Sequence, residues 1–343
     1  MSFEVAISVI MSTHNRAHYL PDALRALAAQ DCDVPFEVIL IDNASTDDTA
    51  GVFQEWCQRD SRFRTAQEPR LGLSYGKNAG INLARAPLLL FSDDDMLVDR
   101  YWISSYHNCF ARRKDELVLV GGPIIPTPHD LGKWPAWFEG SALADLGLLQ
   151  YREERALENP EYVWGGNMAV PARLFDRFGL WDATVGRKGD QRGTFEDTEF
   201  QDRVRKEGVL VWFCPGATVY HRIHRQTVTP RQISSTAFNR GRNAVFENTL
   251  PIWHEVRLVP KRNAVIGLWA LVSSLFWWCL WVMAFWLLKD KSCFNRARCA
   301  AFASGHSLDS LRAGRNSMRL FHGASRIAFP VRRLLLRLIP DHP

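Results

Sequence analysis

Short apolar runs alternate with helical periodicity over roughly the first two thirds of the chain. Runs of apolar residues predict buried strands at 5–11, 36–42, 63–66, 88–91, 117–122, 210–213 and 219–221. Between the runs, apolar side chains recur at helical spacing, as at Leu20, Leu24 and Leu27. Further helices are predicted through 52–56 and over about 74–84, 99–113 and 194–208. Because strands and helices alternate, we predict an α/β fold with a mostly parallel sheet covered by helices.

Three segments depart from this alternation. Residues 123–160 contain several prolines and aromatics and predict a long loop with short helices. Residues 163–170 have strand-like ends but contain two glycines, which suggests the close approach of a ligand or of another backbone. Residues 186–193, which read GRKGDQRG, predict a flexible loop. The segments 123–160 and 186–193 are candidates to close over bound substrates.

Two predicted strands end in carboxylates. The run Leu88–Phe91 is followed by Ser92-Asp-Asp-Asp95, and the strand 36–42 ends in Asp42 before a turn. In extended chain Asp93 and Asp95 point to the same side, where their repulsion is relieved if a magnesium or manganese ion lies between them. The alternative is a solvated acidic turn, since Asp is common in turns. Open α/β sheets bind ligands at the carboxyl ends of their strands, so the repetition favours a nucleotide or metal site there.

Composition narrows the class of protein. The chain has 343 residues, of which 47% are hydrophobic, enough for a sizeable core. Its seven cysteines form no CxxC pair, which argues against a zinc site and for a reducing compartment. The N-terminus lacks the basic and apolar regions of a secretory signal, and we expect none.

The last quarter of the chain differs from the rest. Ala264–Leu288 is 25 residues long and contains no charge and no proline, so we predict a membrane helix there. Residues 1–260 carry a net charge of −5 and residues 261–343 one of +10. This basic tail, with an amphipathic stretch at Ser317–Ile339, suits a lipid surface better than nucleic acid. The helix either crosses the membrane once or lies in it as a re-entrant or in-plane segment.

Four motifs, taken in order, resemble the family 2 glycosyltransferases of the GT-A fold. They are Ser12-Thr-His-Asn-Arg16, Ile41-Asp-Asn-Ala-Ser-Thr-Asp-Asp48, Ser92-Asp-Asp-Asp95, which is similar to the family's DxD motif, and Phe195-Glu-Asp-Thr-Glu199. The resemblance covers about residues 5–225. It implies an inverting glycosyltransferase with a mixed, mostly parallel sheet flanked by helices. The expected organisation is then a GT-A domain (1–250), a linker (251–263), a membrane segment (264–288) and a basic amphipathic tail (289–343).

The resemblance also implies roles for individual residues. The nucleotide-sugar donor, a UDP-sugar as first choice, would be bound by His14, Asn15, Arg16, Asp42, Asn43, Arg70, Lys77, Asn78, Asp93 and Asp94. A divalent cation, Mn²⁺ or Mg²⁺, would be bound by Asp95, Asp93 and His221. The acceptor would be received at Trp164, Gly165, Gly166 and Asn167. For Arg70, Trp164 and His221, the alternatives are a surface charge, a core tryptophan and an ordinary half-buried histidine.

Inverting transfer requires one carboxylate that deprotonates the acceptor hydroxyl as it attacks the anomeric carbon. We assign this role to Asp197, with Glu196 as the rival or as an orienting group. Acidic residues also favour a helix N-terminus, which is the structural alternative for both. The chain has no Gln-x-x-Arg-Trp motif of processive synthases, which favours transfer of a single sugar to a saccharide or lipid-linked acceptor.

Two other functions compete with this interpretation. A sugar nucleotidyltransferase would need a glycine-rich phosphate loop near the first strand, and Ser12–Arg16 contains no glycine. A membrane-anchored binding protein with a degenerate transferase domain would not need the intact acidic motifs. We therefore expect an enzyme of cell-surface glycan biosynthesis whose catalytic domain lies at the cytoplasmic face of the inner membrane.

Overall fold

The computed structural model describes residues 5–113, 116–138, 140–159, 161–184, 196–247, 264–288, 295–301 and 303–304. The chain divides into two compact units. The first unit comprises residues 1–127, 147–158 and 162–222, and the second comprises residues 128–146, 159–161 and 223–343.

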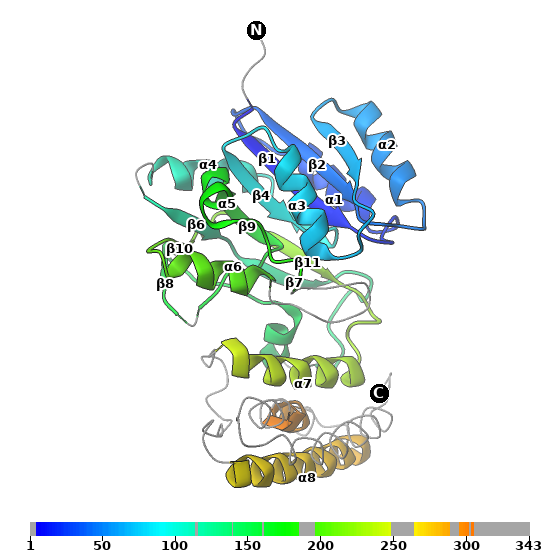
Figure 1. Ribbon diagram of the computed structural model, residues 1–343. Helices are drawn as coiled ribbons and strands as arrows, with labels where there is room; N and C mark the ends of the chain where they lie inside the picture. The colour runs from blue at the N-terminus through cyan, green and yellow to red at the C-terminus, as the bar shows by residue number, and fades with distance from the viewer. Residues whose placement is uncertain are drawn as a thin grey trace. The chain divides into compact units, whose positions relative to one another are not determined.

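The first unit is built on an eight-stranded mixed sheet (Figure 1). Its strand order is β3 (Phe63–Gln67), β2 (Phe36–Asp42), β1 (Ile7–Thr13), β4 (Leu88–Ser92), β9 (Asn167–Pro171), β6 (Val118–Gly121), β10 (Leu210–Phe213) and β8 (Arg155–Leu157). Strands β1, β2, β3 and β4 are mutually parallel, as is the pair β6 and β10. Strand β9 runs antiparallel to both β4 and β6, and β8 runs antiparallel to β10. The prediction of a mostly parallel sheet is therefore confirmed for its N-terminal half.

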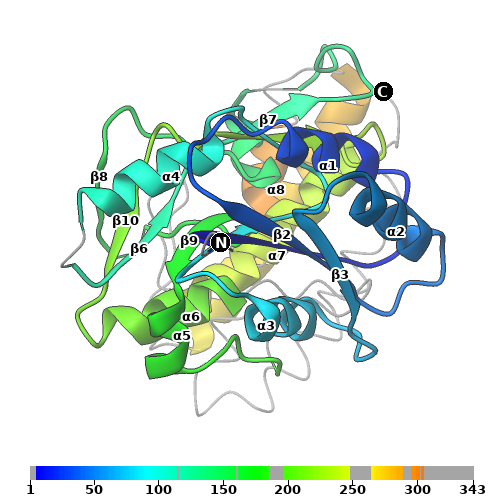
Figure 2. The same cartoon turned by 90° about the horizontal axis from the view of Figure 1, so that it is seen from above.

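Helices cover both faces of this sheet, as the view from above shows (Figure 2). One face packs against α1 (Leu20–Ala28), α2 (Thr49–Arg59) and α4 (Trp102–Ala111), and the other against α3 (Leu73–Leu83), α5 (Ala172–Phe178) and α6 (Glu196–Arg205). The strand β1 explains why: Ile7, Val9 and Met11 belong to one hydrophobic core and Ile10 to the other. A strand whose side chains are apolar in both directions must be covered on both faces.

Several elements were absent from the prediction. A second sheet of order β5 (Met96–Val98), β11 (Val219–Ile223) and β7 (Ile124–Pro128) adjoins the acidic run. Strands β7 and β8 and the short helix η1 (Gly140–Leu146) lie in the segment predicted as a loop with short helices, so that prediction is only partly right. Strands of three residues, such as β5 and β8, are too short to show periodicity. Helices α5 and α7 (Pro230–Glu247) were also not predicted.

The second unit contains η1, α7 and α8 (Ala264–Leu288). Its apolar cluster is formed by Trp137, Phe138, Ala142, Leu146, Ile223, Val228 and Ile233. A buried ion pair joins Arg298 to Asp145, with 2.6 Å between Nη1 and Oδ2. Side chains from η1 and from the helical residues near 298 thus stabilise the same unit.

The predicted membrane helix is not confirmed. Within the residues described here, no helix is long and apolar enough to cross a membrane. The other predictions for this region, the linker 251–263 and the amphipathic stretch Ser317–Ile339, lie outside the described residues, as does the loop 186–193.

Candidate active site

The carboxyl ends of β1 and β2 carry two loops that are bonded to each other. Asn15, in a left-handed conformation with φ 53°, accepts hydrogen bonds at Oδ1 from the backbone N–H groups of Thr46 (2.7 Å) and Asp47 (3.3 Å). His14 Nδ1 lies 2.8 Å from the backbone oxygen of Asn43. Asparagine tolerates this conformation better than most residues because its short side chain can bond locally. The two predicted nucleotide-binding loops therefore form one rigid rim.

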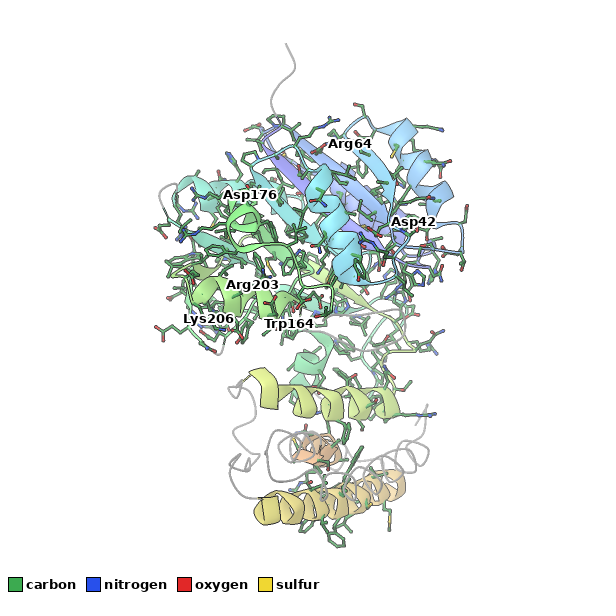
Figure 3. All side chains as sticks on the ribbon, viewed as in Figure 1. Asp42, Arg64, Trp164, Asp176, Arg203 and Lys206 are labelled. Atoms are coloured by element: carbon green, nitrogen blue, oxygen red, sulfur yellow. The ribbon has the colours of Figure 1, made fainter. Side chains whose placement is uncertain are left out.

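Asp42 ends β2 at this rim and is buried, with 5% of its surface exposed (Figure 3). Its Oδ1 accepts a hydrogen bond from the Ser45 backbone N–H at 3.0 Å. Arg70 lies on the loop after β3, where its guanidinium donates two hydrogen bonds of 2.8 Å to the Glu68 carboxylate. The Arg70 guanidinium carbon also lies 4.7 Å from the centre of the Tyr75 ring. Arg70 is thus an exposed cation, with 66% of its side chain accessible, whose guanidinium is oriented by Glu68.

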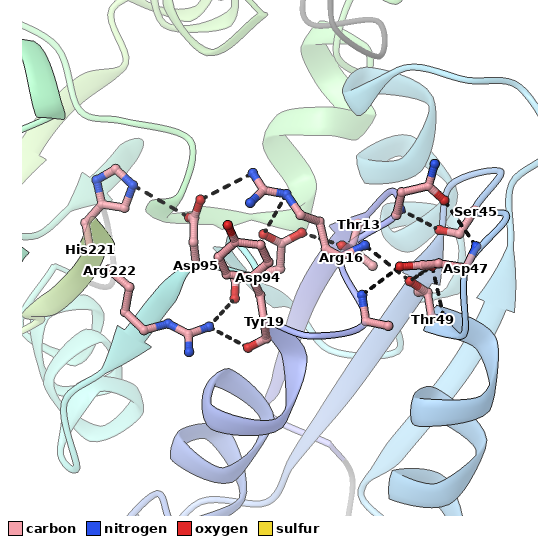
Figure 4. Close-up of polar contacts among 12 residues, drawn as sticks. Thr13, Arg16, Tyr19, Ser45, Asp47, Thr49, Asp94, Asp95, His221 and Arg222 are labelled. Carbon is pink, nitrogen blue, oxygen red and sulfur yellow. Dashed lines mark hydrogen bonds and ion pairs between the residues drawn. The ribbon is translucent and has the colours of Figure 1, made fainter. Parts of the chain in front are cut away.

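Asp94 and Asp95, in the acidic run after β4, both lie near Arg16 (Figure 4). Asp94 is 7% exposed, accepts a hydrogen bond from Thr13 Oγ1, and lies 3.8 Å from Arg16 Nε. Asp95 Oδ2 lies 3.6 Å from Arg16 Nη2, and its Oδ1 lies 3.8 Å from His221 Nε2. Burial, together with repulsion from Asp95, raises the pKa of the Asp94 carboxyl to about 7.

Asp93, the first carboxylate of the run, lies near Lys77. Burial raises the pKa of the Asp93 carboxyl, the charge of Lys77 counteracts this, and Asp95 adds to it. Lys77 is itself buried in α3, where its Nζ lies 3.7 Å from Glu196 Oε1 and 3.5 Å from the Gly165 carbonyl oxygen. Burial lowers the pKa of Lys77, but Glu196, Asp93 and Asp197 outweigh it and raise the pKa above its usual value. Lys77 is therefore a charged ammonium among three carboxylates.

The two acidic residues at the start of α6 have different surroundings. Asp197 accepts a hydrogen bond at Oδ2 from the Gly165 N–H and one at Oδ1 from the Thr198 N–H, at 2.9 and 2.8 Å. Glu196 is 4% exposed; burial raises the pKa of its carboxyl, and its Oε2 has no hydrogen-bond partner within the described structure. Both side chains are buried, with 8% of Asp197 and 4% of Glu196 exposed. Backbone N–H groups orient the Asp197 carboxylate, whereas Glu196 lies beside the Lys77 ammonium.

The Gly165-Gly166 turn packs between these charged groups. A methyl group at Gly165 would lie 2.7 Å from Lys77 Nζ, and one at Gly166 would lie 2.5 Å from Asp93 Oδ2. The glycines suggested from sequence a close approach of a ligand or backbone, and here the approach is to Lys77 and Asp93. Trp164, just before the turn, is 38% exposed, so a face of its ring is accessible (Figure 3). The acceptor motif therefore combines an accessible aromatic with a turn that spaces the acidic residues.

We expect Gly166→Ala to lower kcat/KM by about ten- to a hundredfold, because the added methyl group displaces the Asp93 carboxylate. The measurement is steady-state transfer once a donor is known. Gly140→Ala is the matched control, since a methyl group there meets no atom within 4 Å. Equal activity of the two variants would show that the position of Asp93 does not matter.

Three of the asparagines predicted to contact substrates form hydrogen bonds with backbone groups in the structure. Asn43 donates from Nδ2 to the carbonyl oxygens of Glu68 and Arg70 and accepts the Gly72 N–H. Asn78 makes two hydrogen bonds with the Trp181 backbone. Asn167 is completely buried and fully bonded. Asn43 and Asn167 use both amide donors and the acceptor in these bonds, whereas Asn78 uses one donor and the acceptor, so all three side chains brace the backbone around the site.

Sequence reasoning missed residues that hold the site together. Arg222 is 3% exposed and donates to the Asp94 carbonyl oxygen at 3.1 Å and to Asp22 Oδ2 at 2.9 Å. Gln201 is completely buried and bonds the backbone of Val163 in both directions at 2.9 Å. Arg222 thus ties the acidic run to α1, and Gln201 ties α6 to the segment before the glycine turn. A signal was present only for Arg222, which follows the predicted ligand His221.

The predicted metal ligands have the donor types that Mn²⁺ and Mg²⁺ accept, namely carboxylate oxygens and an imidazole. The distance of 3.8 Å between Asp95 Oδ1 and His221 Nε2 is too long for a hydrogen bond. In the described parts of the chain, however, three or more such side chains are nowhere gathered closely enough to hold an ion. The types of ligand atom therefore fit a cation, but within the described residues these side chains are not close enough together to form a complete metal site.

Comparison with known proteins finds relatives among the glycosyltransferases. Residues 8–173 match the sequence profile described as Glycosyl transferase family 2. A hyaluronan synthase from Pasteurella multocida is 25% identical over 64% of this chain and 24% of its own length. A glucosyl-dolichyl phosphate glucuronosyltransferase from Haloferax volcanii is 21% identical over 63% of this chain and 69% of its own. The chain thus spans only about a quarter of the synthase.

Two solved structures share the fold. S. aureus TarS 1-349 in complex with UDP has a TM-score of 0.50 and 18% identity, covering 89% of this chain and 90% of that one. The mannosyltransferase PcManGT from Pyrobaculum calidifontis, in complex with GDP-Man and Mn²⁺, has a TM-score of 0.50 and 16% identity, covering 98% and 86%. The mixed sheet flanked by helices is a GT-A-like fold. Residues 8–173 form a domain of the family 2 glycosyltransferases, and the protein is a glycosyltransferase.

Proposed function

We propose that the protein is an inverting, metal-dependent glycosyltransferase that moves a single sugar from a nucleotide-diphosphate sugar to a saccharide or lipid-linked acceptor. The observation that carries the proposal is the pairing of Asp197 with the glycine turn. Its Oδ2 is held 2.9 Å from the Gly165 N–H, beside the exposed Trp164 and close to Lys77 and Asp93. A base, an aromatic surface and a DxD carboxylate thus meet in one place.

The donor binds at the rim formed by the loops after β1 and β2. Asp42 accepts hydrogen bonds from the nucleotide base, with His14, Arg16 and Arg70 around it. The oriented guanidinium of Arg70, gripped by Glu68, supports this role. A UDP-sugar is the first candidate and is supported by the TarS structure in complex with UDP, while the PcManGT complex holds GDP-Man.

Asp95 and Asp93, with His221, are the residues that would hold a divalent cation. When bound, such a cation supplies Lewis-acid stabilisation of the leaving diphosphate. Arg16 is placed to share this work, since it lies within 4 Å of both Asp94 and Asp95. The Mn²⁺ in the PcManGT complex supports the choice of metal.

Asp197 deprotonates the acceptor hydroxyl, which attacks the anomeric carbon on the face opposite the leaving nucleotide. Direct displacement of this kind needs no covalent intermediate on the protein. Glu196 and Lys77 form an ion pair behind Asp197 and hold the N-terminus of α6 against the glycine turn. Trp164 offers its accessible ring as a stacking surface for the acceptor sugar.

The acceptor and location complete the proposal. A lipid-linked acceptor is supported by the Haloferax volcanii relative, whose name describes transfer to a glucosyl-dolichyl phosphate. The basic tail and the apolar segment 264–288 support association with membrane lipid. We place the enzyme in cell-surface glycan biosynthesis, at the cytoplasmic face of the inner membrane.

A donor screen tests this function. We expect one of a panel of UDP-, GDP- and dTDP-sugars to raise the melting temperature of the full chain only when Mn²⁺ or Mg²⁺ is present. Asp95→Ala should abolish this shift, because it removes a carboxylate that holds the cation. Asp202→Ala is the control, since this carboxylate on α6 accepts a hydrogen bond from Tyr162 and lies outside the proposed metal ligands.

The outcomes separate the alternatives. A donor that binds without nucleotide release, with every acceptor tested, would favour a degenerate binding protein. A donor that stabilises the chain equally well with a chelator present would show that donor binding does not depend on a metal. If no nucleotide sugar binds, the proposed donor site is wrong.

A further inference from the structure

The helix α8 has two different faces. Within its described side chains, Leu271, Leu275, Trp278 and Val282 are buried, with 0–7% of their surface exposed. The opposite side forms an apolar stripe of five residues, Val272, Phe276, Trp277, Leu280 and Met283, of which 40–62% is exposed. Four of them are spaced by three or four residues and so share one side of the helix. Isolated apolar residues are common on protein surfaces, but a stripe of this kind calls for a partner.

The buried face already has its partners inside the second unit. Trp278 stacks on Phe238 of α7, with ring centres 5.7 Å apart. The hydroxyl of Ser274 donates to the Leu271 carbonyl oxygen and accepts a hydrogen bond from Ser304 at 3.1 Å. The Ser274 hydroxyl of α8 therefore faces the protein, and the apolar stripe is the side that remains available to an external partner.

The charges at the ends of α8 indicate what that partner is. Lys261 and Arg262 precede the helix, and Lys289 and Lys291 follow it with one carboxylate, Asp290, between them. From residue 289 to the end, the sequence has 11 Lys and Arg against 3 Asp and Glu. Two copies of the chain packed stripe to stripe would bring cations together at both ends, in either relative direction. An anionic lipid surface instead attracts both ends and accepts the stripe between them.

We infer that the apolar stripe of α8 is a lipid-contacting surface that inserts into a bilayer carrying anionic headgroups. The inference rests on the membrane location in the proposed function and names the surface responsible for it. The inference requires only that one side of α8 stays packed on the protein while the other side contacts lipid. It involves no catalytic step. Phe276 and Trp277 supply the aromatic rings that favour the boundary between headgroups and hydrocarbon.

Vesicle flotation of the full chain tests the inference. The probes are vesicles of phosphatidylcholine alone and of phosphatidylcholine mixed with phosphatidylglycerol. We expect the protein to float with the mixed vesicles and the double variant Phe276→Glu, Leu280→Glu to bind them at least about tenfold more weakly, because charge is excluded from the apolar layer. Leu210→Glu is the matched control: Leu210 is an apolar residue of similar exposure, 43%, on β10 of the first unit.

Three results would overturn the inference: equal flotation of the double variant and the control, complete release of the unmodified chain by high salt, or a dimer in light scattering that the double variant alone disrupts. The last would assign the stripe to a second copy. Each sample is also melted with and without nucleotide sugar. Loss of flotation in the double variant with an intact donor response confirms the lipid surface, and absent flotation of the unmodified chain with an intact donor response contradicts the lipid surface alone. A missing donor response with normal flotation contradicts only the transferase function.

Discussion

Replacement of Asp197 by Asn should lower kcat about a thousandfold while donor binding is retained, because a general base contributes roughly 10²–10⁴ to the rate. Asn cannot accept the proton of the acceptor hydroxyl. Its side chain has the same shape, and its remaining oxygen can still accept one of the bonds from Gly165 or Thr198. The measurements are single-turnover sugar transfer and donor-induced thermal stabilisation of the same preparations.

Two further variants make this prediction specific. Glu199→Gln, two residues further along α6, removes a carboxylate that pairs with Arg203 and should leave turnover unchanged. Glu196→Gln distinguishes the rival base: we expect it to loosen the contact with Lys77 and to lower activity less than Asp197→Asn. If Glu196→Gln has the larger effect and Asp197→Asn the smaller one, the two roles must be exchanged.

Replacement of Asn167 by Ala should destabilise the first unit by about 3–5 kcal/mol, since it leaves several buried groups without partners. The Asn167 amide accepts hydrogen bonds of 2.8 Å from Trp102 Nε1 and Tyr106 Oη. It donates hydrogen bonds of 2.9 Å to the carbonyl oxygens of Pro123 and Ala217. Denaturant unfolding of the full chain, followed by tryptophan fluorescence, measures the loss.

Asn108→Ala is the control for this second prediction. Asn108 is exposed on α4, the helix that also carries Trp102 and Tyr106, so its replacement should change stability by no more than about 0.5 kcal/mol. An Asn167→Ala protein as stable as the control, but unable to transfer sugar, would return Asn167 to the acceptor site predicted from sequence.

The parallel half of the sheet could be predicted because its strands signal themselves locally. β1, β2 and β4 are continuous apolar runs, as strands buried on both faces must be. The antiparallel half was harder. Strand β9 begins directly after Gly165 and Gly166. Its pairing of Asn167 with Ser92 at the end of β4 depends on the strand register, which no local pattern encodes.

The candidate site shows the same division. The acidic residues Asp93, Asp95 and Asp197 were selected from sequence because carboxylates directly after a buried strand or at the start of a helix suggest a bound cation or a catalytic base. Asparagines do not reveal their role in this way, since an amide can equally bind a ligand or imitate the backbone. Asn43, Asn78 and Asn167 proved to be bonded to backbone groups, and only their contacts could show it.

The sequence by itself determined the class of fold, the order of its acidic motifs and the carboxyl edge at which they gather, because these follow from periodicity and from the chemistry of single side chains. Only the tertiary structure decided the arrangement of Lys77 among Asp93, Glu196 and Asp197, and the packing of the Gly165-Gly166 turn between them. These residues lie far apart in the chain, and their distances depend on how β4, β9, α3 and α6 pack. Packing is a property of the whole fold, and it also decided which side of α8 is left exposed.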